Sequence, residues 1–203
     1  MLVDFVGDVH AKFPEFNQLV KDSKADLIIQ LGDLGIGFKP KDGFHPFQVQ
    51  MPEKVLFIRG NHDNPELCQK HPNYMGDFGI KQVDGLNIGF IGGAFSIDHK
   101  ERIMYRDIWP NEQLTKAQMD EAYELITKNK IHIMISHDCP KIINQKMIRE
   151  KPDNSSTVEF LQEIYNKTKP TLWLFGHYHE HKTVVHEGTT FQCLGILRKA
   201  QVE

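Results

Sequence analysis

The stretch LVDFVGDVH at residues 2–10 places a short apolar run directly before a carboxylate and an imidazole. The run Leu2–Val6 is typical of a buried strand, and Gly7 allows a sharp turn and a close backbone approach after it. In an extended segment, the i, i+2 spacing of Asp8 and His10 puts both side chains on one face. The stretch therefore predicts a strand that ends in two groups able to bind a cation.

Four further apolar runs along the chain end in the same way. They lead into the polar motifs Gly32-Asp33, Gly60-Asn61-His62-Asp63, Ser136-His137-Asp138 and Gly176-His177-Tyr178-His179. The carboxyl ends of sheet strands form the crevice in which α/β proteins bind their substrates. We therefore expect the polar side chains of all five motifs to meet in one such crevice.

The apolar runs and the stretches between them predict an α/β fold. We expect buried strands at Leu2–Val6, Leu27–Leu31, Val55–Ile58, Leu86–Ile91, Ile131–Ile135 and Leu172–Phe175, and a C-terminal hairpin at Lys182–His186 and Thr190–Leu194. We expect helices at Phe13–Lys21, Thr115–Lys128 and Ser156–Tyr165. Since some strands lack helical partners, we predict two packed mixed β-sheets flanked by helices, in a single domain of residues 1–203.

Composition narrows the class of protein. The chain has 203 residues, of which 40% are hydrophobic and 25% charged, and this is ordinary for a globular domain. Its net charge of −3 gives no basic footprint for duplex nucleic acid. Three cysteines without a CxxC pair favour a reducing compartment. No apolar run approaches the roughly 18 residues of a membrane span, and cleavage of a leader of about 15–30 residues would remove Gly7. We therefore expect a cytoplasmic protein that does not engage membranes.

The residue types of the five motifs indicate which metals they suit. The motifs offer carboxylate, imidazole and amide groups and no thiolate, which suits Mn, Fe, Zn or Ni and disfavours a structural thiolate zinc site. They hold seven candidate ligands, more than one tetrahedral ion needs, so we expect two divalent ions, with Mn preferred. Two ions about 3.5–4 Å apart clamp the attacking and leaving oxygens in phosphoryl hydrolysis.

The motif order GDxH, GD, GNHD, SHD and GHxH, which runs from Gly7 to His179, resembles the calcineurin-like metallophosphoesterase superfamily. This resemblance implies the family's sandwich fold and seven metal ligands: Asp8, His10 and His179 for the first metal, Asn61, His137 and His177 for the second, and Asp33 as a bridge. It also implies that His62 stands over the leaving group as a general acid or an electrostatic stabiliser, while a metal-bound hydroxide attacks phosphorus.

Other polar residues of the motifs have simpler interpretations. Asp63 is kept beside His62 as a catalytic candidate, but Asp63 and Asp138 are also suited to hold neighbouring histidines or loops, and Asp63 to pair with Arg59. Gly76-Asp77 is expected to be an ordinary turn. We expect five further histidines to be surface or core residues: His45, His71, His132, His181 and His186.

The segment Gly92–Glu112 resembles a stretch of compact phage and bacterial metallophosphoesterases. Within it, Arg102 or Arg106 is suited to clamp a substrate phosphate. Three aromatic residues are candidates to stack a nucleobase: Trp109, Tyr105 and Phe44, the last from the stretch Leu34–Pro52. The alternative is that Trp109 packs the loop onto the sheet and that both arginines are solvated.

The sequence differs from some branches of the superfamily, and these differences narrow the expected function. The second motif reads GDLGIG, whereas serine/threonine protein phosphatases have GDxVDRG, so their phosphate-clamping arginine has no match. GNHD is more typical of phosphodiesterase-like branches. Only 24 residues follow His179, too few for the DNA-binding cap of repair nucleases.

We therefore predict a phosphodiesterase acting on a small nucleotide-type or cyclic phosphate ester. Alternatives are a phosphomonoesterase or protein phosphatase, a nuclease on single-stranded nucleic acid, and a non-catalytic scaffold. Nothing in the sequence indicates an oligomeric state.

Overall fold

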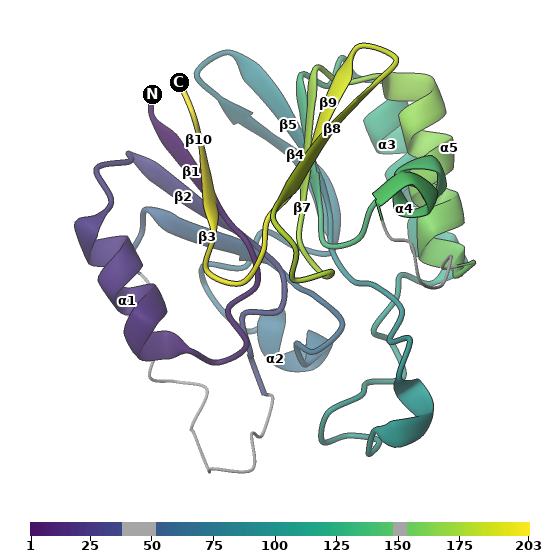
Figure 1. The fold of residues 1–203 in the computed structure, drawn as a ribbon. Coiled ribbons are helices and arrows are strands. Elements are labelled where there is room, and N and C mark those ends of the chain that lie inside the picture. The colour runs from purple at the N-terminus through teal and green to yellow at the C-terminus, as the bar shows by residue number, and fades with distance from the viewer. Residues whose placement is uncertain (38–51, 148–153) are drawn as a thin grey trace.

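The computed structural model describes residues 1–37, 52–147 and 154–203, which form two β-sheets that face each other (Figure 1). The first sheet has the strand order β10-β1-β2-β3, with bounds Lys199–Val202, Val3–Val6, Leu27–Leu31 and Val55–Ile58. Strands β1, β2 and β3 run parallel, and β10 pairs antiparallel with β1. The carboxyl ends of the three parallel strands therefore point the same way.

The second sheet has the order β4-β5-β6-β7-β9-β8. Its bounds are Phe78–Val83, Leu86–Ile91, Ile133–Ser136, Leu172–Phe175, Thr189–Cys193 and Lys182–His186. Its centre, β5-β6-β7-β9, is parallel, and the hairpin partners β4 and β8 add antiparallel edges. Both sheets are thus mixed.

Helices cover the outer faces of the two sheets. Helix α1 (Phe13–Asp22) lies on the first sheet, and α3 (Lys116–Thr127), α4 (Lys141–Met147) and α5 (Ser156–Thr168) lie on the second (Figure 1). The short helix α2 (Pro65–Cys68) and a 3-10 turn, His99–Glu101, lie in loops. Within the described ranges, no helix is long and apolar enough to cross a membrane. The layers confirm the predicted α/β fold of two mixed sheets flanked by helices.

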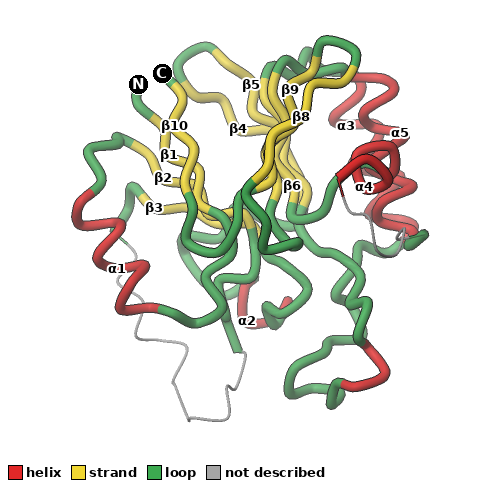
Figure 2. The backbone as a smooth tube through the Cα atoms, viewed as in Figure 1, coloured by secondary structure: helices red, strands yellow, loops and turns green. Residues whose placement is uncertain are grey.

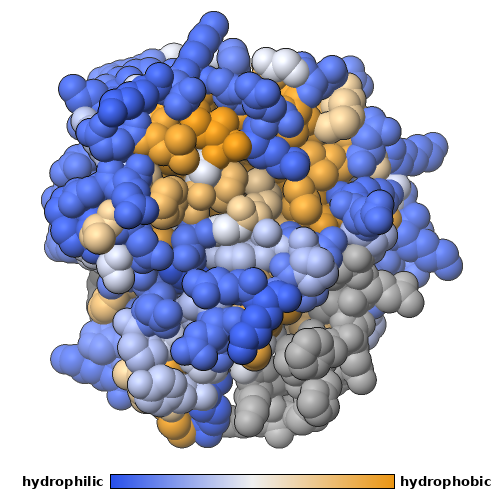
Figure 3. Space-filling model, turned by 180° about the vertical axis from the view of Figure 1, so that it is seen from behind, coloured by the Kyte–Doolittle hydropathy of each residue, from blue (hydrophilic) through white to orange (hydrophobic). Residues whose placement is uncertain are grey.

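Side-chain alternation along the strands builds the layers. In β1, Val3 and Phe5 pack between the sheets, while Val6 packs beneath α1 against Phe16. Where the parallel strands begin, Phe5 and Ile88 help line an apolar pocket of about 170 Å³ between the sheets. Seen from behind, apolar residues gather in the upper half of the molecule, and hydrophilic residues cover most of the rest (Figure 3). The polar chemistry lies at the opposite ends of the strands, which the motif loops follow.

The six predicted buried strands, the hairpin and the three predicted helices are all present, with small shifts at their ends. Sequence reasoning missed strands β4 and β10 and helices α2 and α4. Strands β4 and β10 are sheet edges with mixed burial, so their apolar signal is weak. Helices α2 and α4 are short. Most of the stretch Leu34–Pro52, including Phe44 and His45, lies outside the described residues.

Candidate metal centre

The five polar motifs lie in loops that follow β1, β2, β3, β6 and β7 at their carboxyl ends. Figure 2 shows these loops in green below the two sheets, where they converge. Side-chain atoms from all five motifs approach to within 4.8 Å in three groups: Asp8 with His10 and His179, His10 with Asp33 and His62, and Asp8 with Asp33 and His137. Asn61 joins them through His137, and the ring of His177 lies against His137, with centroids 5.1 Å apart.

Asp33 lies at the middle of this cluster. Its Oδ2 is 3.7 Å from Nε2 of His10, 3.5 Å from Nε2 of His137 and 3.8 Å from Nε2 of His62. Its Oδ1 accepts the backbone N–H of His62 at 2.9 Å. The residue is buried, so the carboxylate faces ligand candidates instead of water. This position suits a carboxylate that bridges two cations.

Asp8 offers a buried oxygen that lacks a donor. Its Oδ1 accepts the backbone N–H of His177 at 3.0 Å, whereas its Oδ2 accepts no hydrogen bond from the described residues. Oδ2 lies 3.4 Å from Nε2 of His10 and 3.2 Å from Nε2 of His179. Burial raises the pKa of Asp8, but the two imidazoles outweigh it and lower this pKa to about 2. An ionised, buried oxygen without a donor is the kind of atom that a cation satisfies.

His137 holds a proton where a cation would fit. Its Nδ1 donates to the carbonyl of Leu31 at 2.8 Å, and its Nε2 lies 3.1 Å from Oδ1 of Asn61. With Asp33 also nearby, both ring nitrogens face acceptors, so both carry protons in the metal-free protein. Burial disfavours this charge, but Asp33 and Asp8 outweigh it and raise the pKa of His137 to about 10. The Nδ1 bond also fixes the tautomer that leaves Nε2 free for a metal.

Binding of Mn²⁺ at neutral pH is expected to release protons. Since the pKa of His137 is about 10, its Nε2 carries a proton at pH 7 that a cation must displace. Apparent affinity should therefore fall as pH falls below that pKa. Titration calorimetry in buffers of different ionisation enthalpy measures the release, which His137→Gln should reduce by about one proton. An unchanged release in the variant would contradict this account of the site.

The backbone is strained or crowded at the predicted ligands. Four of them adopt left-handed φ angles: His10 at 48°, Asp33 at 56°, His177 at 69° and His179 at 57°. Such strain gathers at functional sites, where the surrounding structure holds it. The preceding glycines are needed for space, because a Cβ on Gly60 would lie 2.1 Å from Oδ1 of Asp33 and one on Gly176 would lie 2.2 Å from Oδ1 of Asp8.

His62 is enclosed by residues of the Gly92–Glu112 segment. Two terminal nitrogens of Arg102 lie 2.7 and 2.9 Å from the two ring nitrogens of His62, and Asp98 fixes this guanidinium at 2.6 Å. The indole N–H of Trp109 donates to the carbonyl of His62 at 3.1 Å. Burial lowers the pKa of His62 to about 4. Asp33 opposes this shift, and the positive charge of Arg102 adds to it. His62 is therefore neutral at pH 7.

The structure separates the two candidate arginines. The side chain of Arg102 is only 15% exposed and lies against His62. The alternative prediction, that Arg102 is solvated, is therefore wrong. Arg106 is 48% exposed, and its side chain pairs with Asp107. Trp109 is buried, as the packing alternative predicted, while Tyr105 is 73% exposed.

Asp63 requires a correction. Its buried carboxylate accepts four backbone N–H groups, from Leu34, Gly35, Ile36 and Gly60, at 2.7–3.2 Å. These bonds tie the loop after β2 to the loop after β3, so the contacts support a structural role and not the catalytic one. Arg59 pairs with Asp77 at 2.5 Å, not with Asp63. Asp77 also accepts the hydroxyl of Tyr74, which makes it an anchor and not only part of a turn.

Sequence reasoning missed Tyr178, which lies between two predicted ligands. Its hydroxyl donates to Asp138 and accepts from Nδ2 of Asn144 on α4 at 2.8 Å. Strand alternation could not have found it, because His177 and His179 have left-handed φ angles and the ring of Tyr178 lies against that of His177, with centroids 4.8 Å apart. Asp138 thus holds a neighbouring loop, as its simpler interpretation predicted. Ser96, whose Oγ accepts a hydrogen bond from Nδ2 of Asn61 at 2.9 Å, lies in the segment Gly92–Glu112, but no pattern marked this residue within it.

The four described histidines that were expected to be surface or core residues, His71, His132, His181 and His186, lie outside the cluster. Nδ1 of His71 accepts the N–H of Asn73, and Nδ1 of His132 accepts that of Asn87. His186 lies beside Lys146, and His181 is exposed. These contacts agree with their expected roles as surface or core residues.

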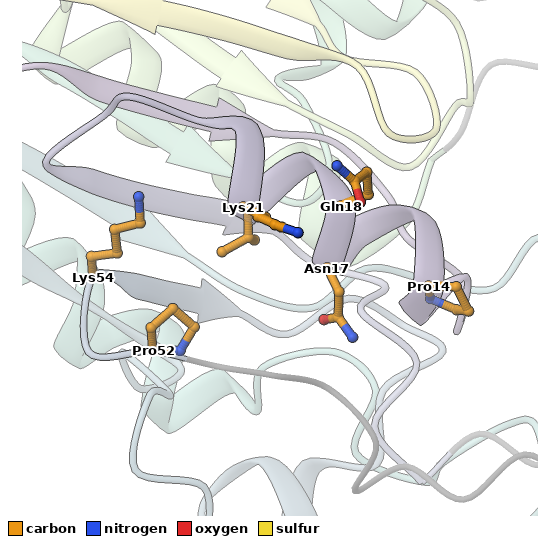
Figure 4. Close-up of a pocket in the computed structure, with 7 residues that line it drawn as sticks. Pro14, Asn17, Gln18, Lys21, Pro52 and Lys54 are labelled. Carbon is orange, nitrogen blue, oxygen red and sulfur yellow. The ribbon is translucent and has the colours of Figure 1, made fainter.

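A separate polar groove lies beside α1. It has a volume of about 530 Å³, and Figure 4 shows the residues that line it, among them Asn17, Gln18 and Lys21 on the helix and Pro52 and Lys54 beyond it. Lys54 is already engaged, because its Nζ donates to the carbonyls of Ser23 and Ala25. None of the residues that line the groove is a ligand candidate, so the candidate site is the histidine–carboxylate cluster.

Comparison with known proteins identifies the family. Residues 1–181 match the model of the calcineurin-like phosphoesterases, and the chain belongs to that family. Members of the family typically bind divalent metals, in agreement with the Asp and His groups described above. No curated protein matches the chain significantly.

Three solved structures illustrate the shared fold. A conserved protein from Streptococcus pneumoniae, described as a predicted phosphoesterase, is 10% identical with a TM-score of 0.50, covering 100% of this chain and 83% of its own. The phosphopantetheinyl hydrolase of Mycobacterium tuberculosis is 13% identical with a TM-score of 0.52, covering 98% and 95%. GAP50, the anchor in the inner membrane complex of Plasmodium, is 16% identical with a TM-score of 0.53, covering 96% and 71%. At these identities the likeness concerns the fold alone.

Proposed function

We propose that this protein hydrolyses phosphate esters with two divalent ions, and that it prefers small nucleotide-type or cyclic phosphate diesters. The observation that carries the proposal is the convergence of buried ligand candidates around Asp33. Mn is the proposed ion, with Fe, Zn or Ni as alternatives that suit the same donors. Asp8, His10 and His179 would hold one ion and Asn61, His137 and His177 the other, with Asp33 between them. Such ions make a water molecule nucleophilic and stabilise charge on phosphoryl oxygens.

His62 acts in this proposal as a hydrogen-bond donor to the leaving-group oxygen. With a pKa of about 4, its imidazole is neutral at pH 7 and has no extra proton to transfer. Of the two roles considered for His62, electrostatic stabilisation therefore fits better than general acid catalysis. A neutral imidazole still carries one N–H, which is able to stabilise developing negative charge.

Arg102 supplies the phosphate contact. Its guanidinium is held by Asp98 and by the carbonyl of Asp107, at 2.6 and 3.2 Å, so its position beside His62 is set before substrate arrives. A guanidinium binds phosphate oxygens with two parallel hydrogen bonds. In this role Arg102 binds the phosphate next to His62, which donates a hydrogen bond to the leaving-group oxygen.

The second motif favours a diesterase over a protein phosphatase. Leu34 and Ile36 are buried with α1, and a Cβ on Gly35 would lie 2.6 Å from the backbone nitrogen of Ala11. The arginine of GDxVDRG would align with Gly37, where φ is 75° and a Cβ would lie 2.6 Å from the Cβ of Asn64, so the loop has no room for it. The candidate partner is accordingly a small phosphate ester; nucleic acid is not favoured.

Replacing Arg102 by alanine should weaken substrate binding. A hydrogen bond to a charged group contributes about 1.5–3 kcal/mol, so kcat/KM should fall about 10- to 100-fold, mainly through KM. Arg106→Ala is the matched control, because Arg106 is half exposed and pairs with Asp107. Steady-state kinetics on one diester compares the two variants. Equal effects of both would argue against the clamp.

Hydrolysis of bis-p-nitrophenyl phosphate and p-nitrophenyl phosphate, with Mn²⁺ restored to metal-stripped protein, tests the proposed function. Faster turnover of the diester supports it, whereas faster turnover of the monoester would indicate a phosphomonoesterase. Single-stranded RNA and DNA are tested in parallel, and preferential cleavage of either would indicate a nuclease. If two ions bind and none of these substrates is cleaved, the proposal for small diesters loses its support and a scaffold role gains it.

A further inference from the structure

A buried carboxylate closes the loop between Ser96 and Glu112. One oxygen of Glu112 accepts the backbone N–H of Ser96 at 2.9 Å, and the other accepts its hydroxyl at 2.7 Å. Both residues are buried. The loop between them protrudes beside the motif loops in Figure 1, and its own bonds, such as that from the N–H of Ile103 to Asp107 at 2.5 Å, hold it together. The pair therefore fixes where this loop leaves the body of the protein.

The same serine contacts a predicted metal ligand. Its Oγ accepts a hydrogen bond from Nδ2 of Asn61 at 2.9 Å. A serine hydroxyl has one proton, and here that proton points to Glu112, so towards Asn61 the oxygen acts as an acceptor. Asn61 must therefore turn its NH₂ group to Ser96, which leaves Oδ1 facing Nε2 of His137 at 3.1 Å.

The direction of these bonds matters for cation binding. An amide offers a cation either an oxygen lone pair or an NH₂ group with positive hydrogens, and rotation about χ2 exchanges the two. Because Asn61 donates to Ser96 and Ser96 donates to Glu112, the orientation with Oδ1 of Asn61 towards His137 is favoured. Arg59 supports it from behind, because its Nη1 donates to the backbone carbonyl of Glu112 at 2.6 Å.

We propose that Glu112, acting through Ser96, is a positioning residue that orients the amide of Asn61 so that its oxygen faces the cation site beside His137. The proposal rests on the proposed function only in taking Asn61 as a metal ligand. It adds two residues to the site, each from a part of the chain without a metal-binding motif.

The isosteric variant Glu112→Gln provides a sharp test. A glutamine keeps the oxygen that accepts the N–H of Ser96 but places an NH₂ group against the hydroxyl. The hydroxyl then has to donate towards Asn61, which favours the flipped amide. Ser96→Ala removes the link without reversing it. We therefore expect Glu112→Gln to weaken the second Mn²⁺ about 10- to 100-fold, Ser96→Ala to weaken it less, and the first ion to bind nearly as before.

The double variant separates orientation from folding. With Ser96 replaced by alanine, the glutamine has no hydroxyl to reverse, so the double variant should return to the affinity of Ser96→Ala. The exposed Glu159→Gln on α5 is the control for the loss of a carboxylate. Calorimetric titration with Mn²⁺ gives these affinities without any turnover, so the result stands apart from whether the protein hydrolyses esters. Unchanged second-ion affinity in Ser96→Ala and Glu112→Gln, equal losses at both ions, or additive losses in the double variant would overturn the proposal.

Discussion

Replacing Asp33 by alanine is expected to remove cation binding at both positions and, with it, all metal-dependent turnover. Asp33 is the carboxylate whose Oδ2 lies within 3.5–3.8 Å of three imidazole nitrogens. Substitutions one shell away from a metal typically cost 10- to 100-fold in affinity, so removal of the bridge itself should cost more than about 100-fold. Equilibrium dialysis with Mn²⁺ measures the stoichiometry directly.

The comparison must separate lost binding from lost folding. Asp22→Ala, at an exposed carboxylate on α1, is the matched control and should bind two ions. Thermal unfolding of both variants and of the unaltered protein in the presence of a chelator shows whether the fold survives the change at Asp33. If the folded Asp33→Ala protein bound two ions with unaltered affinity, the cluster would not be the metal centre.

Replacing His62 by alanine should reduce turnover about 10²- to 10³-fold and leave both ions bound. Geometry alone leaves His62 two roles, because it also forms a candidate ligand group with His10 and Asp33. The guanidinium of Arg102 lies beside both ring nitrogens of His62, so either role requires this guanidinium to shift, but seven other residues already supply candidate ligands for two ions. His62 is therefore assigned to the leaving group.

Metal stoichiometry and turnover of the same His62→Ala sample distinguish the two roles. Loss of an ion would make His62 a ligand and refute this assignment. His62→Gln, which keeps an N–H donor, should retain more activity than the alanine variant. Because the pKa of His62 is lowered to about 4, its neutral form is lost only as pH falls through that value. His62 should therefore add no limb to the rate profile between pH 6 and 8.

Much of the fold follows from local patterns in the sequence. The buried strands of the sheet centres are mostly apolar, with single polar residues such as Asp4 and Gln30, so their residues alone distinguish them. Strand β10 is different, because its residues alternate between exposed and half-buried, and it is defined by pairing with β1 nearly two hundred residues away. Such a pairing depends on tertiary contacts that a local window does not contain.

The candidate metal ligands are recognisable in the sequence because each follows a strand, whereas the residues that support them are not. The bond between Asn61 and Ser96 joins residues 35 positions apart, and Ser96 and Glu112 are separated by 16. Nothing in the local sequence of either residue indicates a role at the site. The sequence left the role of Asp63 open between catalysis and holding a loop, because a motif does not show that both its oxygens are taken by backbone N–H groups.

The most direct test of a two-metal hydrolase is to add Mn²⁺ stepwise to metal-stripped protein while following turnover of bis-p-nitrophenyl phosphate. The ligand cluster predicts no turnover without metal, a rise that levels off when two ions are bound per chain, and loss of turnover on chelation. Turnover that is complete with one ion bound, or that persists without any, would contradict the account.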